Sequence, residues 1–458
     1  MYNIDFSHPV HVHFLGIGGI SMSGLAMILM SEGFSVSGSD MKESALTAEL
    51  AEKGAEVFIG QKAENITNDI DLAVYTAAIS DDNEEIMEVR RRGIPELSRA
   101  QLLGQMMKNY KIPINIAGTH GKTTTSSMIS EILLHADLDP TITVGGMLKS
   151  IGGNLRIGGS EYFVAEACEY TNSFLSFLPR IEVILNIEED HLDFFKDIDD
   201  IRASFKRFIE LLPDDGCLII NGGIDRLSDL TCGISCPVIT YGDSDAYDYY
   251  PADVSFDDAG RGRYTCCHGS DRFEVKLGVV GIHNVYNSLA AIALCEKLGV
   301  DRAVMLKALE DFTGTDRRFE KKGVLHGITV IDDYAHHPTE IAATLAAAKR
   351  YPHKKLFLVF QPHTYSRTKA FLKEFAEALS AADVVLLTDI YAAREKNTIG
   401  ISSKDLADLM ETKGTNVHYF QYFDDVETYL LEHCESGDMI LTMGAGDVYT
   451  IGEKLLGK

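Results

Sequence analysis

The sequence predicts an α/β protein of three domains, because strand-like and helix-like segments alternate and two glycine-rich loops each start a separate unit. A chain of 458 residues is also too long for one ordinary domain of about 100 to 200 residues. A hydrophobic content of 45% beside 24% charged residues fits a globular chain. We place the boundaries near residues 110 and 320, so the expected domains are 1–110, 111–320 and 321–458.

The first domain opens with a strand, a glycine turn and a helix. The segment HVHFLGIG (11–18) reads as the strand and turn, a helix follows over 19–32, and a second strand ends at Asp40. N–H groups of such a turn bind phosphate, and the terminal carboxylate accepts from ribose hydroxyls, so the domain is Rossmann-like. Ser21 occupies the third glycine position of the fingerprint, and a plain tight turn is the alternative. The candidate ligand-binding residues are Gly16, Gly18, Gly19, Ile20, Ser21 and Asp40.

A second loop, GTHGKTTTSS (118–127), lies between a strand from about Ile112 and a helix from Lys122. Its N–H groups and the lysine suit phosphates, and Thr123 offers a hydroxyl to Mg²⁺. Ile116 stands where the commoner P-loop has glycine, so this is the short GxxGKT form. A coincidental turn is the alternative, but the flanking strand and helix favour a central P-loop ATPase-like domain. The predicted phosphate-binding residues are Gly118, Thr119, His120, Gly121, Lys122, Thr123 and Thr124.

Two further candidates for Mg²⁺ lie at the ends of apolar strands. Glu166 lies in FVAEACEY and His191 in VILNIEEDHLDFF. A metal ion that bridges triphosphate oxygens needs such ligands in addition to a loop hydroxyl. Each residue also has a structural alternative, since a strand-end glutamate is usually solvated and a histidine beside Asp190 is often only hydrogen-bonded. The predicted metal set is Thr123, Glu166 and His191.

A strongly apolar helix opens with GIHNVYNSLAAIAL, which places His283, Asn284 and Asn287 near its start. Asparagine amides offer the paired donors and acceptors that suit an adenine edge, although an N-cap is the default role at one such position. Arg317 and Arg318 follow in GTDRRF beside the second boundary. They are either ordinary surface charges or groups that neutralise a γ-phosphate.

From Val324 onward strand-like and helical segments alternate again, which predicts a C-terminal Rossmann-like, doubly wound sheet. Its first strand ends in IDDYAHHPTE, which contains Asp332 and His337. Such a density of polar groups at a strand end indicates a site, while a helix cap before Pro338 or a chance histidine pair are the alternatives. Arg367 in FQPHTYSRT follows the next strand and can clamp a carboxylate.

Charge and composition exclude several classes of partner. The chain carries 42 basic and 68 acidic residues, a net charge of −26, so it repels a phosphate backbone and nucleic acid is not expected. The run from Val12 to Met30 contains several glycines and serines and follows no basic residue, so we expect neither a signal peptide nor a membrane anchor. Eight scattered cysteines without a CxxC pair favour reduced thiols in the cytoplasm.

The ordered motifs resemble those of the Mur ligases. These motifs are GIGGISMSGLA, GTHGKTTT, the segments around Glu166 and His191, GIHNVYNSLAA, GTDRRFE, DDYAHHPTEI, FQPHTYSRT and MGAGD. The resemblance covers essentially the whole chain, and the first motif and HTYSRT favour the alanine-adding branch of the family. It implies that the first loop holds UDP-N-acetylmuramate, the second loop holds ATP with Mg²⁺, and the last domain brings L-alanine. The two glycine loops therefore correspond to two nucleotides.

The reaction that the resemblance implies is an ATP-dependent ligation in peptidoglycan precursor synthesis. The lactyl carboxylate attacks the γ-phosphate to give an acyl phosphate, and the amine of L-alanine then attacks the activated carbonyl. Attachment of a recycled murein tripeptide to the same sugar nucleotide is the alternative. A dehydrogenase or a P-loop switch protein would explain only one of the two loops. Oligomeric state is expected to be a monomer or weak homodimer.

The resemblance also implies individual roles. By motif, Lys122 and the loop contact the ATP phosphates, Arg317 approaches the γ-phosphate and Asp332 the ribose. His337 and Arg367 lie on the side of the amino acid and the lactyl carboxylate. The predicted catalytic residues are Lys122, His191, Arg317, His337 and Arg367, and the predicted nucleotide contacts add His283, Asn284 and Asn287. The chain departs from the commonest pattern at Cys168, Tyr170, Thr171 and Thr364.

Overall fold

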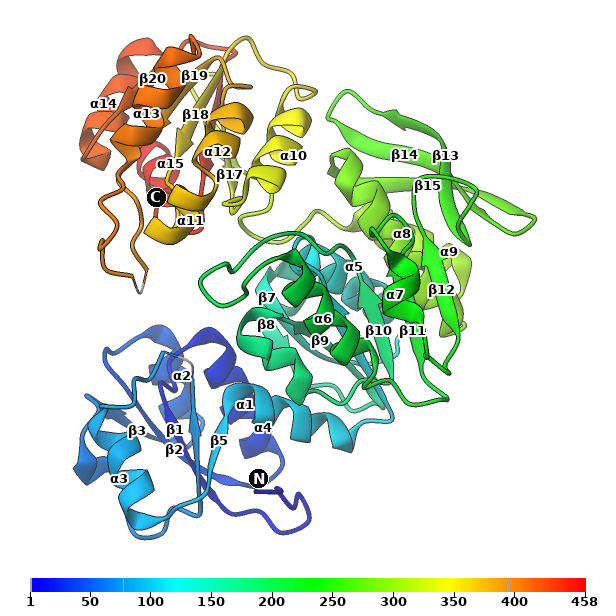
Figure 1. The fold of residues 1–458 in the computed structure, drawn as a ribbon, viewed down its shortest axis with the longest axis vertical. Coiled ribbons are helices and arrows are strands. Elements are labelled where there is room, and N and C mark those ends of the chain that lie inside the picture. The colour runs from blue at the N-terminus through cyan, green and yellow to red at the C-terminus, as the bar shows by residue number, and fades with distance from the viewer. Residues whose placement is uncertain (1, 77, 394) are drawn as a thin grey trace.

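The computed structural model of the protein describes residues 2–76, 78–393 and 395–458. Figure 1 shows three α/β bodies that follow one another along the chain, each with its own sheet. The predicted three-domain α/β architecture is confirmed. Across the described residues, none of the helices is both long and apolar enough to span a membrane.

The first sheet is entirely parallel, with strand order β3-β2-β1-β4-β5. Its strands are β1 (His11–Leu15), β2 (Ser35–Asp40), β3 (Glu56–Ile59), β4 (Leu72–Tyr75) and β5 (Glu96–Ser98). The helices around it are α1 (Ile20–Ser31), α2 (Ala45–Glu52), α3 (Glu84–Arg92) and α4 (Arg99–Met106), with 3₁₀ turns η1 (Ala63–Asn65) and η2 (Met107–Asn109). The predicted strand, glycine turn, helix and second strand are all present.

The second sheet has ten strands in the order β15-β14-β13-β12-β11-β10-β6-β9-β7-β8. Its inner strands are parallel and its two ends are antiparallel hairpins. The strands are β6 (Ile112–Ala117), β7 (Thr141–Leu148), β8 (Gly153–Arg156), β9 (Tyr162–Ala167), β10 (Ile181–Ile184), β11 (Cys217–Asn221), β12 (Val238–Tyr241), β13 (Tyr249–Phe256), β14 (Arg261–His268) and β15 (Asp271–Val280). The helical elements are α5 (Lys122–His135), α6 (Ile198–Ile209), α7 (Leu227–Thr231), α8 (Ile282–Lys297), α9 (Arg302–Asp311), η3 (Lys149–Ile151) and η4 (Tyr170–Ser176).

The third sheet runs β16-β17-β21-β18-β19-β20, and only its edge pair β16–β17 is antiparallel. Its strands are β16 (Glu320–Leu325), β17 (Ile328–Asp333), β18 (Leu356–Phe360), β19 (Val384–Leu387), β20 (Val417–Tyr419) and β21 (Met439–Met443). The helices are α10 (Pro338–Ala348), α11 (Tyr365–Ala370), α12 (Leu372–Leu379), α13 (Ser403–Thr412), α14 (Phe423–His433) and α15 (Tyr449–Leu455).

One predicted helix of this domain is divided in two. The segment SRTKAFLKEFAEALSAA forms α11 and α12, which meet at Phe371 with φ −110° and ψ 27°. The ring of Phe371 lies 4.9 Å from that of His337 in edge-to-face contact. The break therefore directs an aromatic side chain at the start of α10, a tertiary contact that helical periodicity cannot reveal.

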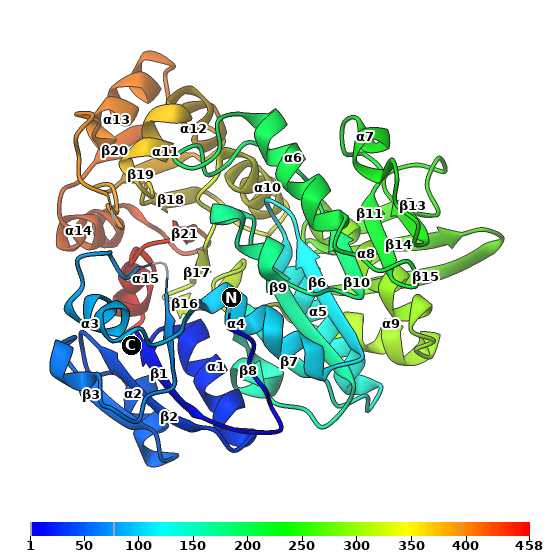
Figure 2. The same cartoon turned by 60° about the horizontal axis from the view of Figure 1, so that its bottom comes forward.

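The first two domains share a continuous hydrophobic core. Apolar side chains of β1, α1 and α4 pack in one cluster with those of β9, η4 and α6. Helix α4 comes so close to η4 that a Cβ at Gly104 would lie 1.8 Å from the carbonyl oxygen of Ser176. Glycine is required there because the backbones touch. The close packing places the first glycine loop beside the central domain, as the view in Figure 2 also shows.

A buried carboxyl in the central sheet makes stability depend on pH. Glu182 on β10 is fully buried beside Asn115 on β6, and neither side chain has a hydrogen-bond partner among the described residues. Burial raises the pKa of Glu182 well above its ordinary value. The folded state therefore retains a proton that the unfolded chain releases, and stability falls as pH rises from the unfolded pKa toward the folded one.

We expect Glu182→Gln to unfold at a higher temperature than the parent at pH 8 and at nearly the same temperature at pH 4. The amide carries no proton to lose, so it removes a cost that grows by about 1.4 kcal/mol for each pH unit between the two pKa values. Thermal unfolding followed by circular dichroism measures the difference. Exposed Glu52→Gln is the control, and equal shifts at both pH values would contradict the pH-dependent account.

Candidate active site

The second glycine loop joins β6 to α5 and is fixed by the neighbouring strand end. Gly118 and Gly121 have φ values of 146° and 84°, which only glycine adopts without strain. The backbone N–H groups of Thr119 and His120 donate to the backbone and side-chain oxygens of Asn186, at 3.2 and 2.8 Å. The loop is thus held open at the N-terminus of α5, where unpaired N–H groups favour an anion.

Lys122 lies at the end of this loop and is partly buried, with 17% of its side chain exposed. Its Nζ forms an ion pair with Glu169 at 3.1 Å and donates to the backbone oxygens of Gly118 and Thr119. Burial lowers the pKa of Lys122, but the Glu169 carboxylate raises it more, so the net pKa lies above its ordinary value. Glu169, which is 2% exposed, was missed by the sequence analysis. Its only signal was a second acid three residues after Glu166.

The predicted metal residues Thr123 and Glu166 are in direct contact. The Thr123 hydroxyl donates to Glu166 Oε2 at 3.1 Å, and Glu166 Oε1 accepts from the Ser126 hydroxyl and the Gly145 N–H. The carboxylate therefore sits at the first turn of α5, directly below the phosphate loop. Hard oxygen donors placed next to a phosphate-binding loop are the set that Mg²⁺ prefers.

His191 lies on the loop after β10, in a left-handed conformation with φ 53°. Its ring stands 4.6 Å from that of Tyr170, and its backbone N–H donates to Asp190 at 2.7 Å. Burial lowers the pKa of His191 below its ordinary value, although Asp190 opposes the shift. The neutral imidazole keeps a lone pair at neutral pH, as a metal ligand must. No hydrogen bond joins it to Thr123 or Glu166 within the described part of the chain.

A cavity of about 310 Å³ opens beside the phosphate loop, between the central and third domains. Among the residues that sequence analysis selected, its wall contains His120, Gly121, Thr124, His283, Asn284 and Asn287. Asn284 anchors the start of α8 by donating to the Val280 oxygen at 2.7 Å, and its own oxygen accepts from Asn287 at 3.0 Å. A Cβ at Gly121 would lie 2.8 Å from the side-chain oxygen of Asn287, so the loop passes directly beside this amide. The two amides therefore lie at the start of α8 next to the phosphate loop and line one face of the cavity.

Arg317 and Asp332 do not line this cavity; their chain neighbours do. Arg317 donates to Asp332 at 3.0 Å and to the oxygens of Gly444 and Gly446, and its guanidinium lies over the rings of Tyr334 and Tyr449. The cavity wall instead holds Arg318 and Asp333. Successive residues of a strand face opposite sides, so one position decides which acid faces the cavity. The nucleotide roles given to Arg317 and Asp332 stay predictions.

Asp333 is one of three acids in the described cavity wall, with Glu188 and Glu340, and none of the three was among the predicted site residues. The Asp333 carboxylate accepts from the backbone N–H groups of Phe319 and Ala335, at 2.7 and 2.8 Å. Burial raises its pKa to about 6, although Arg318 and these hydrogen bonds oppose the shift. The two neighbouring aspartates therefore differ in their surroundings. Asp332 pairs with Arg317, and Asp333 faces the cavity.

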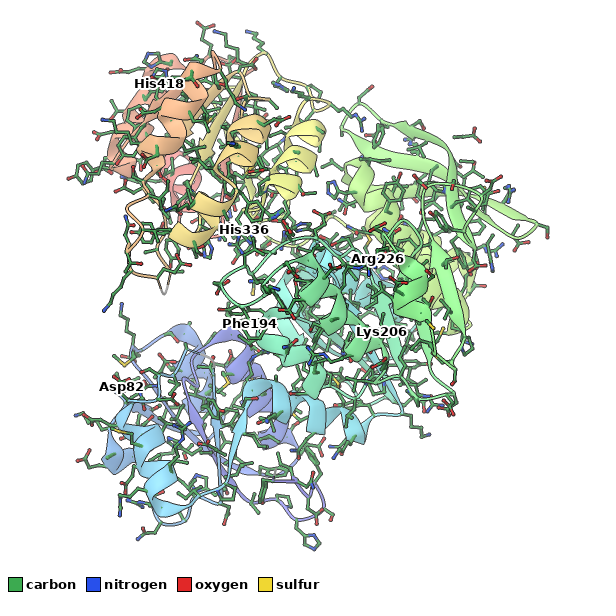
Figure 3. The ribbon with its side chains drawn as sticks, viewed as in Figure 1. Asp82, Phe194, Lys206, Arg226, His336 and His418 are labelled. Carbon is green, nitrogen blue, oxygen red and sulfur yellow. The ribbon has the colours of Figure 1, made fainter. Side chains whose placement is uncertain are left out.

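The third domain contacts the central one through the loop that carries His191. Arg367 donates to Asp190 at 2.8 and 3.2 Å, and His337 Nε2 lies 3.0 Å from the Glu189 oxygen. His337 is also the N-cap of α10, followed by Pro338, which is the structural alternative that the sequence offered. Figure 3 marks the neighbouring His336 at this junction between the two domains.

A small pocket of about 140 Å³ lies at the same contact. Its lining includes Asp190, His191, Thr364, Ser366 and Arg367. Burial raises the pKa of Asp190, but Arg367 lowers it more, so its carboxylate is charged at neutral pH. The predicted residues His191 and Arg367 thus come together, although 176 positions of sequence separate them in the printed chain.

The first glycine loop has the expected turn but uses Asp40 internally. Gly16 has φ 86°, and the N–H of Gly18 donates to Asp40 Oδ2 at 2.9 Å. The start of α1 has no side-chain cap, and Ile20 is 56% exposed. Ser21 accepts a hydrogen bond from Arg99 at 3.0 Å. The role of Asp40 toward ribose stays a prediction, while its contact with the loop is structural.

Comparisons with known proteins find relatives along the length of the chain. Three family models cover most of the chain: the Mur ligase family catalytic domain over residues 11–111, the Mur ligase middle domain over 116–295, and the Mur ligase glutamate ligase domain over 317–446. The chain is 60% identical to the UDP-N-acetylmuramate--L-alanine ligases of Agathobacter rectalis and Lachnospira eligens, with all of both chains aligned.

Solved structures of related ligases share the fold of this chain. The UDP-N-acetylmuramate-alanine ligase of Thermotoga maritima is 31% identical with a TM-score of 0.82, and 98% of each chain is covered. The murein peptide ligase of Psychrobacter arcticus is 26% identical with a TM-score of 0.73 over 98% of each chain. With three family models along its length and full-length relatives at 60% identity, this chain belongs to the Mur ligase family.

Proposed function

We propose that the protein joins L-alanine to the lactyl carboxylate of UDP-N-acetylmuramate at the expense of ATP. The observation that carries the proposal is 60% identity over the whole chain to ligases of that name. The murein peptide ligase is the alternative, and its identity of 26% is less than half as great. We also propose the domain boundaries near residues 110 and 320, which fall close to the limits of the matched family models.

ATP binds in the cavity beside the second glycine loop. The loop N–H groups and Lys122 receive the phosphates, and the amides of Asn284 and Asn287 face the base. Lys122 keeps its ion pair with the buried Glu169 and turns one of its two backbone contacts in the loop toward a phosphate oxygen. Arg318, which lies in the cavity wall, supplies a further positive charge.

The oxygens of Glu166 and Thr123 fit a Mg²⁺ ion, and neutral His191 can complete the set from the other side of the loop. When bound, the ion neutralises negative charge on the phosphate oxygens. The chain's own residues position the reactants: the loop fixes the triphosphate, and the first glycine loop fixes the UDP group on the neighbouring domain. The two nucleotides thus occupy neighbouring domains.

The reaction needs ATP because a carboxylate is a poor electrophile and must first be activated as an acyl phosphate. An oxygen of the lactyl carboxylate forms a bond to the γ-phosphorus, the bond from that phosphorus to the bridging oxygen breaks, and ADP departs. The L-alanine amine then attacks the acyl carbon, phosphate leaves with its oxygen, and the amine loses a proton. Lys122 stabilises the charge on the transferred phosphoryl group in both steps. The small pocket at Arg367 suits the carboxylate of L-alanine.

Product identification tests the proposal. We expect incubation with UDP-N-acetylmuramate, ATP, Mg²⁺ and L-alanine to give one product whose mass equals the sum of the sugar nucleotide and alanine minus one water. A parallel reaction with a murein tripeptide in place of L-alanine is the control. Product from the tripeptide but not from L-alanine would reject the proposal in favour of the peptide ligase.

A further inference from the structure

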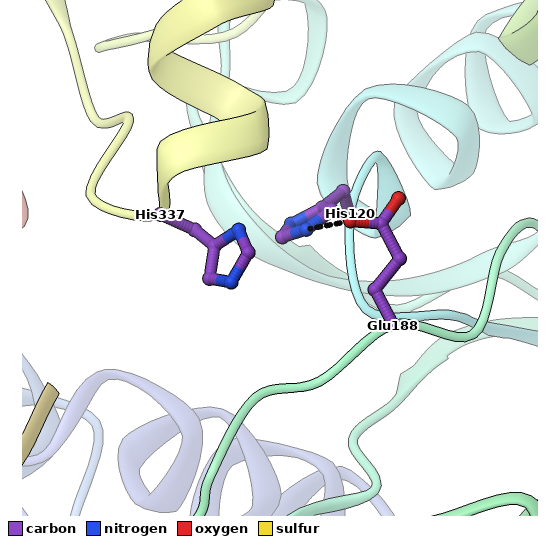
Figure 4. A group of neighbouring side chains, drawn as sticks. All are labelled: His120, Glu188 and His337. Atoms are coloured by element: carbon purple, nitrogen blue, oxygen red, sulfur yellow. Dashed lines mark ion pairs between the residues drawn. The ribbon is translucent and has the colours of Figure 1, made fainter. Parts of the chain in front are cut away.

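A charged cluster joins the phosphate loop to the start of α10. His120 belongs to the loop, Glu188 to the segment after β10, and Thr339 and Glu340 to the first turn of α10. Figure 4 shows His120 directed at Glu188, with His337 facing it from the third domain. These groups connect two domains at the residue that precedes Gly121 and Lys122.

Both ring nitrogens of His120 face carboxylates. Nε2 lies 3.5 Å from Glu188 and Nδ1 lies 3.2 Å from Glu340. Neither contact has hydrogen-bond geometry, but two carboxylates within ion-pair distance of one imidazole favour the form in which both nitrogens carry hydrogen and the ring is positive. Burial lowers the pKa of His120, but Glu188 and Glu340 raise it more, to about 9. At neutral pH the side chain is therefore an imidazolium that bridges the two domains.

The same geometry argues against a metal ion in this cluster. His120, Glu188 and His337 have ligand atoms within 4.8 Å of one another. The nitrogens of His337 are already used, however, because Nε2 lies 3.0 Å from the Glu189 oxygen and Nδ1 accepts from the Thr339 N–H at 3.3 Å. His120 likewise directs each nitrogen at an acid. The cluster is thus an ion-pair network and not a set of free ligands.

Both acids of the network, Glu188 and Glu340, have further contacts besides His120. Glu188 accepts from the Thr339 hydroxyl at 2.8 Å, a second contact between the domains. Glu340 lies 3.4 Å from the His336 ring and 3.9 Å from Arg318. The His337 ring, which is 4.7 Å from the His120 ring and tilted by 40° to it, completes the charged and titratable groups around His120. Because Arg318 and Glu340 also line the large cavity, the network is continuous with the proposed ATP site.

We propose that His120 is a positioning residue that couples the packing of α10, and with it the third domain, against the central domain to the conformation of the phosphate loop. The backbone N–H of His120 is fixed by Asn186 and its ring by Glu340, so movement of α10 pulls on the loop next to Lys122. This inference rests on the proposed function only in naming ATP as the ligand of the loop. It predicts that Glu340 influences ATP affinity through His120.

A double-mutant cycle tests the coupling. We expect His120→Gln and Glu340→Gln each to raise the KM for ATP about 10-fold, and the double variant to raise it about 10-fold and not about 100-fold. The KM for the sugar nucleotide should change little, because its loop lies in another domain. Exposed Glu374→Gln in the same domain is the matched control. Effects that multiply in the double variant would overturn the proposal.

Nuclear magnetic resonance of the His120 ring gives a readout that needs no turnover. We expect a pKa near 9 in the parent and a lower one in Glu340→Gln, since one of the two carboxylates is lost. Thr339→Val, which keeps all charges, should leave that pKa nearly unchanged and serves if the charge variants unfold. A His120 pKa that Glu340→Gln leaves unmoved overturns the proposal. If the pKa moves but no ligation product forms, the proposed function fails and the coupling stands.

Discussion

Lys122→Ala abolishes ligation while binding of UDP-N-acetylmuramate stays nearly intact. The ammonium lies against the backbone of the phosphate loop, and loss of a group that stabilises transition-state charge costs about 10²- to 10³-fold in rate or more. In the proposed arrangement the first glycine loop, which belongs to a separate sheet, holds the sugar nucleotide. Product formation and calorimetric binding of the sugar nucleotide measure the two effects separately.

Lys122 also neutralises Glu169, so this variant needs a control in which both charges are removed. Removal of Lys122 alone leaves a carboxylate that is 2% exposed without its partner, which destabilises a fold by about 3 to 5 kcal/mol. The double change Lys122→Ala with Glu169→Gln removes both charges and keeps the domain folded. If this folded double variant loses affinity for UDP-N-acetylmuramate as strongly as it loses ligation, the assignment of two nucleotides to two loops is wrong.

Glu166→Gln raises the Mg²⁺ concentration needed for half-maximal activity and lowers the rate even at saturating Mg²⁺. The amide keeps the size of the side chain and one acceptor for the Gly145 N–H, and its nitrogen can donate to the Thr123 hydroxyl. What it lacks is the negative charge that a hard divalent cation requires. We expect a shift of about 10-fold or more in the Mg²⁺ dependence, measured by ligation rate across a metal titration.

Glu161→Gln is the matched control, because Glu161 directly precedes the same strand, is partly exposed and pairs with Lys111. It should leave the metal titration unchanged. Parent-like Mg²⁺ dependence and rate in Glu166→Gln would mean that this glutamate only fastens β9 to α5. In that case the predicted metal set of Thr123, Glu166 and His191 loses its charged member.

The elements of this protein follow from local sequence patterns. The two glycine loops were recognisable because each lies between an apolar strand and a helix, and a positive φ at Gly16, Gly118 or Gly121 depends on the residue itself. Strand and helix periodicities are likewise short-range properties, so the α/β class and the three sheets were predictable. The exception is the break at Phe371, where a contact with His337 from another segment interrupts a helical pattern.

Which side chains meet was decided only by the tertiary structure. Glu169 opposite Lys122, Glu340 opposite His120 and Asp190 opposite Arg367 join segments that are 47, 220 and 177 positions apart. No pattern of spacing encodes such pairs, because they depend on how domains pack and on the direction of each side chain.

The same limit applies to the two pairs of neighbours at the second domain boundary, Arg317 with Arg318 and Asp332 with Asp333. The sequence pattern predicts acids and arginines at the second domain boundary but not the direction of each side chain. Because successive residues of a strand face opposite sides, Asp332 pairs with Arg317, and Asp333 lines the cavity together with Arg318. The sequence by itself determined the loops, the strands and the kinds of chemical group at their ends. Only the packed structure decided which of those groups are buried as ion pairs and which line a cavity, because burial and charge pairing are properties of the assembled domains.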